Sequence, residues 1–309
     1  MSDSPSKSIP PAVVAGDPVA APAPDGKSAG PFRRLLRDPM GLTGLILVVV
    51  FFGTAIFAPM LTPYEPSRIS IVDGKIERQL PPSLAHPAGT DQLGRDVLTR
   101  VFFGGRVALQ VAAVAVTVSL VTGLMLGMIA GYGPRWLDSA LLLVFDTINS
   151  FPAIVLSLAI ISLTQPSLFM VILVIIINFI PNYGRIARTQ TLALRNTEFI
   201  LAEQSLGAGA GRVLVRHVLP NIVGPLLILA AMNVPVVVTV EAGLSFLGLG
   251  IRPPTPSWGN MLSEGRQILR VAPWVVIAAG IPLVLVTLGF TFLGESLRDI
   301  FDPKLRRGR

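Results

Sequence analysis

Just past its first third the chain reads Val107-Ala-Leu-Gln-Val-Ala-Ala-Val-Ala-Val-Thr-Val-Ser-Leu-Val-Thr-Gly-Leu-Met-Leu-Gly-Met-Ile-Ala-Gly-Tyr132. These 26 residues include no charged side chain, and about 20 mostly apolar residues are enough for a helix to cross a bilayer. Five further segments qualify or nearly qualify, namely Gly41–Leu61, Ser139–Thr164, Ser167–Tyr183, Ile222–Leu249 and Val271–Leu293, and two of these contain one carboxylate each. No stretch alternates apolar and polar residues as barrel strands do. The sequence therefore predicts an all-α polytopic membrane protein with six transmembrane helices.

The overall composition supports a membrane protein and argues against several other classes. Hydrophobic residues make up 51% of the 309 residues and charged residues only 14%, with a mean hydropathy of +0.67. These values indicate that the bilayer is the solvent. With no cysteine and two widely separated histidines, the sequence predicts no metal site and no bound cofactor. The net charge of +7 is explained by basic cytoplasmic segments rather than by a nucleic-acid partner.

The distribution of basic residues indicates how the chain lies in the membrane. With the N-terminus inside, sixteen of the 25 Lys and Arg residues fall in cytoplasmic segments, which favours two cytoplasmic termini. We expect residues 1–31 to form a disordered cytoplasmic tail, because they are rich in Pro, Ala, Ser and Asp. Residues 32–106 are expected to form an anchor helix followed by an extracytoplasmic segment. Residues 107–309 then form a core of five transmembrane helices with a cytoplasmic segment at 185–221.

The end of the extracytoplasmic segment is expected to be helical. Asp91–Arg100 is interpreted as a helix that lies at the outer surface, with Asp91, Arg95 and Asp96 pairing along it.

Small residues and prolines within the spans predict how the helices pack and bend. Gly123, Gly127 and Gly131 recur every four residues and allow another helix to approach closely. We expect this packing to occur within the chain rather than with another subunit. We expect kinks at Pro152, Pro225, Pro235 and Pro282. Transmembrane helices tolerate such kinks where neighbouring groups or water bond the carbonyls that proline leaves free.

Two carboxylates lie inside predicted spans. Asp146 and Glu241 should face protein or water, because a charge at the bilayer centre costs about 2.5–3.5 kcal/mol. Neither has a basic or histidine partner within a predicted span, so the sequence favours structural hydrogen bonding or cavity lining over a proton relay. The candidate polar groups of a translocation pathway are Asp146, Asn178, Asn182, Asn233 and Glu241.

A polar segment between the fourth and fifth spans predicts a docking element. It reads Glu198-Phe-Ile-Leu-Ala-Glu-Gln-Ser-Leu-Gly207, continues for nine residues, and closes with His217-Val-Leu-Pro-Asn221. The pattern predicts a short helix, a break at Gly207, and a second short helix that stops at Pro220. Such a helix–turn–helix presents a structured surface to an aqueous partner.

The same segment resembles the cytoplasmic loop of one family, the permease subunits of bacterial ABC importers of the dipeptide, oligopeptide and nickel type. That family's pattern is Glu-Ala-Ala-(3)-Gly-(9)-Ile-x-Leu-Pro, and this chain matches it at Ala202, Gly207 and Leu219-Pro220. The chain departs from the pattern at Leu201, Glu203 and His217.

Two further stretches resemble the C-type permeases of this family. They are Gly89-Thr-Asp-Gln-Leu-Gly-Arg-Asp-Val-Leu-Thr-Arg100 and Glu241-Ala-Gly-Leu-Ser-Phe-Leu-Gly-Leu-Gly-Ile-Arg-Pro-Pro-Thr-Pro-Ser-Trp-Gly-Asn260. The likeness runs from about Phe32 to the C-terminus, and the three motifs in this order are specific for the family.

The resemblance implies a type I ABC importer permease in the bacterial inner membrane, without a catalytic residue. Its expected partners are a homologous permease, two cytoplasmic ATPases and an extracytoplasmic binding protein. Phe199, Ala202 and Leu206 recur at i, i+3 and i+7, as expected of an apolar stripe that enters a groove on the ATPase. The implied ATPase-coupling residues are Glu198, Phe199, Ala202, Glu203, Leu206, Gly207, Arg212, Arg216, Leu219 and Pro220.

Several alternatives remain open. The implied substrates are dipeptides or oligopeptides, while glutathione and a nickel chelate fit the same resemblance. A secondary transporter would use inverted repeats and intramembrane ion-binding groups. An intramembrane enzyme would need a nucleophile and base or a metal cluster within the spans. A structural or receptor role is the third alternative.

Overall fold

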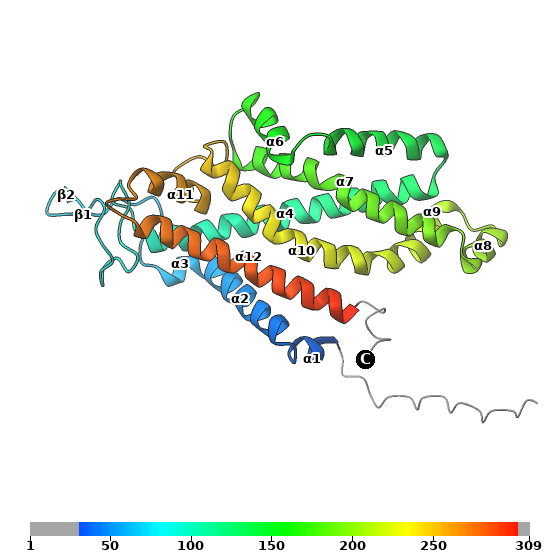
Figure 1. Cartoon of the computed structure of the whole chain (residues 1–309), viewed down its shortest axis with the longest axis horizontal. Helices are drawn as coiled ribbons and strands as arrows, with labels where there is room; N and C mark the ends of the chain where they lie inside the picture. The colour runs from blue at the N-terminus through cyan, green and yellow to red at the C-terminus, as the bar shows by residue number, and fades with distance from the viewer. Residues whose placement is uncertain (1–30, 302–309) are drawn as a thin grey trace, which may run out of the picture.

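The computed structural model describes residues 31–301, and these form a helical bundle with one small hairpin (Figure 1). The first half contains α1 (Pro31–Leu35), α2 (Pro39–Ile56), α3 (Ala58–Leu61), β1 (Ile71–Val72), β2 (Lys75–Ile76), α4 (Val97–Tyr132), α5 (Arg135–Asn149) and α6 (Ala153–Ser162). The second half contains α7 (Leu168–Arg195), α8 (Glu198–Ser205), α9 (Ala210–Val213), the π-helical turn η1 (Leu214–Val218), α10 (Leu219–Phe246), α11 (Trp258–Gln267) and α12 (Trp274–Phe301). The predicted N-terminal tail lies almost entirely outside the described residues.

The number of spans agrees with the sequence prediction. Five helices are long and apolar enough to cross a membrane, and α5 with α6 makes a sixth when the bent pair is counted as one span. The two halves of that pair meet at 85°, with Pro152 between them. Proline lacks the amide hydrogen that would continue the helix, so the predicted kink at Pro152 is a full break.

The glycine stripe of α4 packs against α7, as the sequence predicted. A Cβ atom on Gly123 would lie 2.6 Å from the Cβ atom of Tyr183, and one on Gly131 would lie 2.8 Å from the carbonyl oxygen of Arg188. Gly127 faces the backbone of Gly184 even more closely. The two backbones therefore approach to a distance that only glycine permits.

The fourth span is longer than the sequence predicted. The predicted span ends at Tyr183, with Pro181 near its boundary, but α7 continues to Arg195 with Pro181 buried inside it. Transmembrane helices accommodate proline when neighbouring helices compensate for the missing hydrogen bond. As a result, Arg185 and Arg188 belong to the helix rather than to a cytoplasmic loop.

The prediction of an outer-surface helix at 91–100 was wrong. Residues 91–96 form a turn, and the helix that begins at Val97 is already α4. Asp96 caps this helix by accepting a hydrogen bond from the Thr99 amide at 2.8 Å. Asp91 does pair with Arg95, but both side chains are buried, not exposed at a surface.

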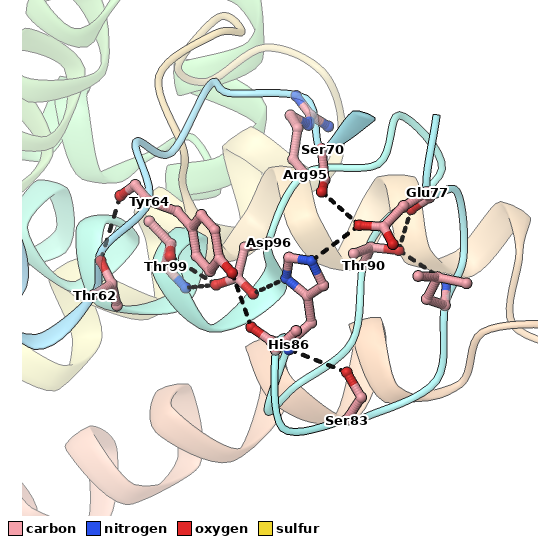
Figure 2. A network of polar contacts seen from close by, with 12 residues as sticks. Thr62, Tyr64, Ser70, Glu77, Ser83, His86, Thr90, Arg95, Asp96 and Thr99 are labelled. Carbon is pink, nitrogen blue, oxygen red and sulfur yellow. Dashed lines mark hydrogen bonds and ion pairs between the residues drawn. The ribbon is translucent and has the colours of Figure 1, made fainter. Parts of the chain in front are cut away.

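Two polar clusters fold the segment between α3 and α4 onto the bundle. In the first, His86 lies between two carboxylates, with Nδ1 2.8 Å from Asp96 Oδ1 and Nε2 3.4 Å from Glu77 Oε2 (Figure 2). The ring of Tyr64 stacks on His86 at 5.1 Å. Each ring nitrogen therefore has a carboxylate neighbour, and the imidazole joins the hairpin side of the segment to the start of α4.

The second cluster joins the same segment to α11. The carboxylate of Asp91 contacts both Arg95 and Arg100, and the two guanidinium groups also contact Glu264 of α11. Arg100 is only 1% exposed. Buried charges require partners of this kind, because an unpaired charge is strongly disfavoured away from water.

Candidate functional site

The polar segment between α7 and α10 forms a compact elbow at one end of the bundle, opposite the hairpin end (Figure 1). Its first helix, α8, ends at Ser205, and Gly207 follows with a φ of +84°. The Gly207 amide donates to the Gln204 carbonyl at 2.9 Å, and the Ala208 amide donates to the Glu203 carbonyl at 3.0 Å. These two bonds form a Schellman motif, which requires a left-handed residue. The predicted break at Gly207 is confirmed, and glycine is the residue suited to it.

The inner side of α8 is fixed to three other helices. Ile200 is fully buried. Gln204 Nε2 donates to Tyr132 Oη at 2.9 Å, which joins α8 to the end of α4. Glu203 Oε1 lies 3.5 Å from Nε2 of His217, in the turn that leads into α10. Side chains of α8 therefore contact α4 and η1, and α8 follows α7 after two residues.

The outer side of α8 exposes apolar side chains. Phe199 is 46% exposed and Leu206 is 85% exposed, and Ala202 between them is exposed as well. These are the three residues of the predicted stripe. Leu201, which the sequence analysis did not include in the stripe, is also 48% exposed. An exposed apolar surface on a short, anchored helix is typical of a docking site.

The second half of the elbow differs from the prediction. Pro220 does not end a second short helix, because α9, η1 and α10 follow one another without a break. The Leu219 amide donates to the Leu214 carbonyl, five residues back. Asn221 Nδ2 donates to the His217 carbonyl at 2.6 Å. A π-turn of this kind lets a helix continue past a residue that lacks an amide hydrogen.

The charged coupling candidates lie at the surface of the elbow. Glu198, Arg212 and Arg216 are exposed. Glu198 lies in the first turn of α8, where the helix dipole favours a negative charge. At the end of the elbow, Leu219 is half-buried and Pro220 is exposed.

The five pathway candidates do not form one site. Asn178 Nδ2 donates to Ser157 Oγ of α6 at 3.2 Å, and Asn233 Nδ2 donates to Tyr183 Oη of α7 at 3.0 Å. Glu241 is 1% exposed and accepts a hydrogen bond from Ser245 Oγ at 2.7 Å. Asn178 and Asn233 thus join neighbouring helices, whereas Glu241 is hydrogen-bonded within α10 itself.

Asp146 and Asn182 are exposed on the outside of the bundle. The expectation that Asp146 has no basic partner in a span was wrong, because its Oδ1 accepts a hydrogen bond from Arg185 of α7. The sequence analysis missed Arg185 because the fourth span was expected to end before it. A second pair joins the same two helices, with Arg188 donating to both oxygens of Asp138.

Comparison with known proteins identifies the family. A family model described as "Binding-protein-dependent transport system inner membrane component" matches residues 123–307, and one described as "N-terminal TM domain of oligopeptide transport permease C" matches residues 31–82. The chain belongs to the binding-protein-dependent transport system inner membrane components. It is therefore a multi-pass inner-membrane permease and not an enzyme.

Curated relatives cover most of this permease. It is 40% identical over 275 residues to the "Dipeptide transport system permease protein DppC" of Alkalihalophilus pseudofirmus, which covers 89% of each chain. It is 36% identical to a "Putative peptide permease protein" of Brucella suis, covering 92% of this chain and 93% of that one. It is 34% identical to the "Glutathione transport system permease protein GsiD" of Pectobacterium atrosepticum, covering 89% and 90%.

A solved structure shares the fold of the permease. A chain of the MetNI methionine ABC transporter, solved in inward-facing conformations, matches with a TM-score of 0.55 and 20% identity. The match covers 67% of this permease and 97% of that chain. The prediction of a type I importer permease fold is confirmed.

Proposed function

We propose that this permease imports short peptides as one half of the membrane channel of an ATP-binding cassette transporter. The dipeptide and peptide permeases named above support this substrate class, and the glutathione permease makes glutathione the second candidate. Family membership implies an ATPase and a binding protein as partners. We propose in addition that the channel needs a homologous second permease and two ATPase subunits.

The observation that carries the coupling role is the two-sided character of α8. One side is fixed through Ile200 and Gln204, while the other exposes Phe199, Ala202 and Leu206. The exposed stripe fits a groove on the ATPase, and Arg212 and Arg216 extend the contact with positive charge. The remaining proposed coupling residues shape the elbow rather than contact the partner, namely Glu198, Glu203, Gly207, Leu219 and Pro220.

Coupling then follows from rigid-body motion. When the two ATPase subunits bind ATP and close, they displace the docked α8. The contacts of α8 transmit this displacement to α4, α7 and α10. Helices that are broken or contain proline, such as α5–α6 and α10, accommodate the change in packing. ATP hydrolysis returns the ATPases to the open state, and the pathway reverts.

The proposed topology places α8 and both termini in the cytoplasm. An even number of spans places α1 and the end of α12 on the same side. The basic residues of α1, Arg33 and Arg34, favour the cytoplasmic face. We accordingly keep the division into a tail at 1–31, an anchor with an extracytoplasmic segment at 32–106, and a permease core from 107 onward. Within that core the segment outside the helical spans is shorter than 185–221, because α7 ends at Arg195 and α9 leads directly into α10.

Uptake by the reconstituted transporter tests this proposal. The permease, its partner permease, the ATPases and the binding protein are placed in proteoliposomes with labelled dipeptide, glutathione or a nickel chelate. We expect dipeptide uptake that requires ATP and binding protein and does not respond to a proton gradient. Uptake driven by the proton gradient without ATP would instead support a secondary transporter and overturn the proposal.

A further inference from the structure

A polar stripe runs along one face of α7 outside its contact with α4. Asn178, Asn182, Arg185 and Thr189 are spaced by four, three and four residues, which at about 100° per residue places them within about 60° of one another. Asn182 and Thr189 are exposed, and the side chain of Arg185 is 43% exposed. The stripe extends over about 17 Å, because eleven residue steps rise about 1.5 Å each.

The stripe lies at membrane depth. Trp136 at the start of α5 is 71% exposed, and exposed tryptophans gather at the membrane–water interface. Asp146 follows ten residues later on the same helix, so it lies about 15 Å further along, within a hydrocarbon region about 30 Å thick. Asp146 is the partner of Arg185, and the Asp146 side chain is 63% exposed.

An exposed ion pair at this depth cannot face lipid. Charged side chains inside a membrane face protein or a water-filled cavity. A continuous polar stripe parallel to the span fits a water-filled pathway better than a helix–helix contact, where small and apolar residues gather. If the permease forms a peptide channel, as proposed above, then Asp146 and Arg185 line it.

The two ion pairs between α5 and α7 differ in how many of their hydrogen-bonding atoms are paired. Arg188 donates to both oxygens of Asp138, and the two side chains are only 22% and 21% exposed. Arg185 donates through one terminal nitrogen to one oxygen of Asp146, while its Nε is buried and has no hydrogen-bond partner among the described residues. The Asp138 pair uses both carboxylate oxygens, whereas the Asp146 pair uses one and is more exposed.

We propose that Asp146 and Arg185 form a binding station for the charged ends of a peptide in transit. The carboxylate of Asp146 accepts from the α-ammonium group of the peptide, and the guanidinium of Arg185 donates to its α-carboxylate, for which the planar fork is suited. The pair opens as the peptide enters, so each of the two charges exchanges one partner for another and their summed charge with the zwitterionic peptide stays at zero. Such a station selects zwitterionic peptides with both ends free, whatever their side chains.

The test compares free and capped dipeptides in the reconstituted transporter. The binding protein is first titrated with each peptide, and only peptides that it binds are used. For the wild type we expect the free dipeptide to be taken up about tenfold faster than its N-acetylated or C-amidated form, since a lost charge-assisted bond is worth about a factor of ten. Asp146→Asn should abolish the preference for a free amine, and Arg185→Gln the preference for a free carboxylate.

Asp138→Asn is the matched control, because it breaks the neighbouring pair between the same helices. It should lower the uptake of free and capped dipeptides by the same factor, so the ratio of free to capped uptake stays unchanged. An unchanged ratio in Asp146→Asn, or an equal change in Asp138→Asn, would overturn the station. If the wild type imports no peptide with ATP, the proposed function itself has failed, which is a separate outcome.

A labelling experiment tests the location without removing either charge. The chain contains no cysteine, so Asn182→Cys gives a single thiol on the stripe, next to Arg185. We expect a water-soluble thiol reagent to label it, and a free dipeptide to slow the labelling more than its capped forms do. A thiol that no aqueous reagent reaches from either side of the membrane would place the stripe in a covered interface and contradict the proposal.

Discussion

Gln204 of α8 donates to the hydroxyl of Tyr132 at the end of α4 across 2.9 Å. The ring of Tyr132 also lies under the guanidinium of Arg195, the last residue of α7, with 5.6 Å between Arg195 Cζ and the ring centroid. One side chain thus connects α8, α4 and α7. Its hydroxyl and its aromatic ring make separate contacts, so substitutions can separate their contributions.

Tyr132→Phe should weaken the coupling between α8 and α4 without unfolding the permease. The substitution removes the hydrogen bond, worth about 0.5–1.5 kcal/mol, and keeps the ring under Arg195. We expect normal membrane insertion and ATPase association, but fewer peptides imported per ATP hydrolysed. The measurement is uptake and ATPase rate in the same proteoliposomes. Coupling equal to that of the wild type would show that this bond transmits no motion.

Ala202→Arg should abolish association with the ATPases. Ala202 is exposed at the centre of the apolar stripe of α8, and a long charged side chain there prevents the stripe from entering a groove. Co-purification from detergent extracts measures the association. The control is Ser205→Arg on the same helix, which adds the same charge about 60° around the helix from Ala202 and about 120° from Phe199 and should retain the ATPases. Wild-type recovery of the ATPases with Ala202→Arg contradicts the docking assignment.

Gly207→Pro should also release the ATPases, through the shape of the elbow rather than its surface. The φ of +84° at Gly207 is far from the value of about −65° that proline imposes, and proline removes the amide that bonds the Gln204 carbonyl. We expect the permease to insert normally and to lose co-purification. Protease accessibility of α8, compared with the wild type, reports whether the elbow has changed.

Gly127→Ala should destabilise the packing of α4 on α7. A Cβ atom at Gly127 would overlap the backbone of Gly184 and lie 2.6 Å from Ala187 Cβ, and overpacking of this kind costs about 1–3 kcal/mol. Gly224→Ala in α10 is the matched control, because a Cβ atom there meets nothing within 4 Å. Thermal unfolding in detergent should show a lower Tm for Gly127→Ala alone. Equal melting of the two variants would argue against close helix contact.

His86→Ala should loosen the segment between α3 and α4, which the proposed topology places outside the cytoplasm. The change removes the contacts of the imidazole with Asp96 and Glu77 and the stacking with Tyr64 (Figure 2). It leaves buried carboxylate oxygens short of partners, at about 1–3 kcal/mol. We expect faster cleavage of this segment by a protease added from the extracytoplasmic side. Lys75→Ala, on the exposed hairpin, is the control and should leave the cleavage rate unchanged. If His86→Ala is cleaved no faster than Lys75→Ala, His86 does not hold this segment in place.

Much of the elbow could be predicted from the sequence because its signals are local. Gly207 marks a helix end by its own backbone freedom, and the spacing of Phe199, Ala202 and Leu206 predicts one face of α8. Pro220 misled the prediction for a related reason. Its missing amide hydrogen predicts a helix stop, but whether a π-turn absorbs the defect depends on carbonyls and side chains in adjacent turns, such as Asn221.

The sequence by itself determined that the chain crosses the membrane in six helical segments. Backbone groups in lipid must find their hydrogen bonds within the same segment, so length and apolar composition suffice. Only the tertiary structure decided that α7 runs past the buried Pro181 and brings Arg185 to Asp146, on a helix 39 residues away in sequence. That pairing depends on how two helices are rotated and shifted against each other. Packing between side chains distant in the chain sets both quantities, and no local signal encodes them.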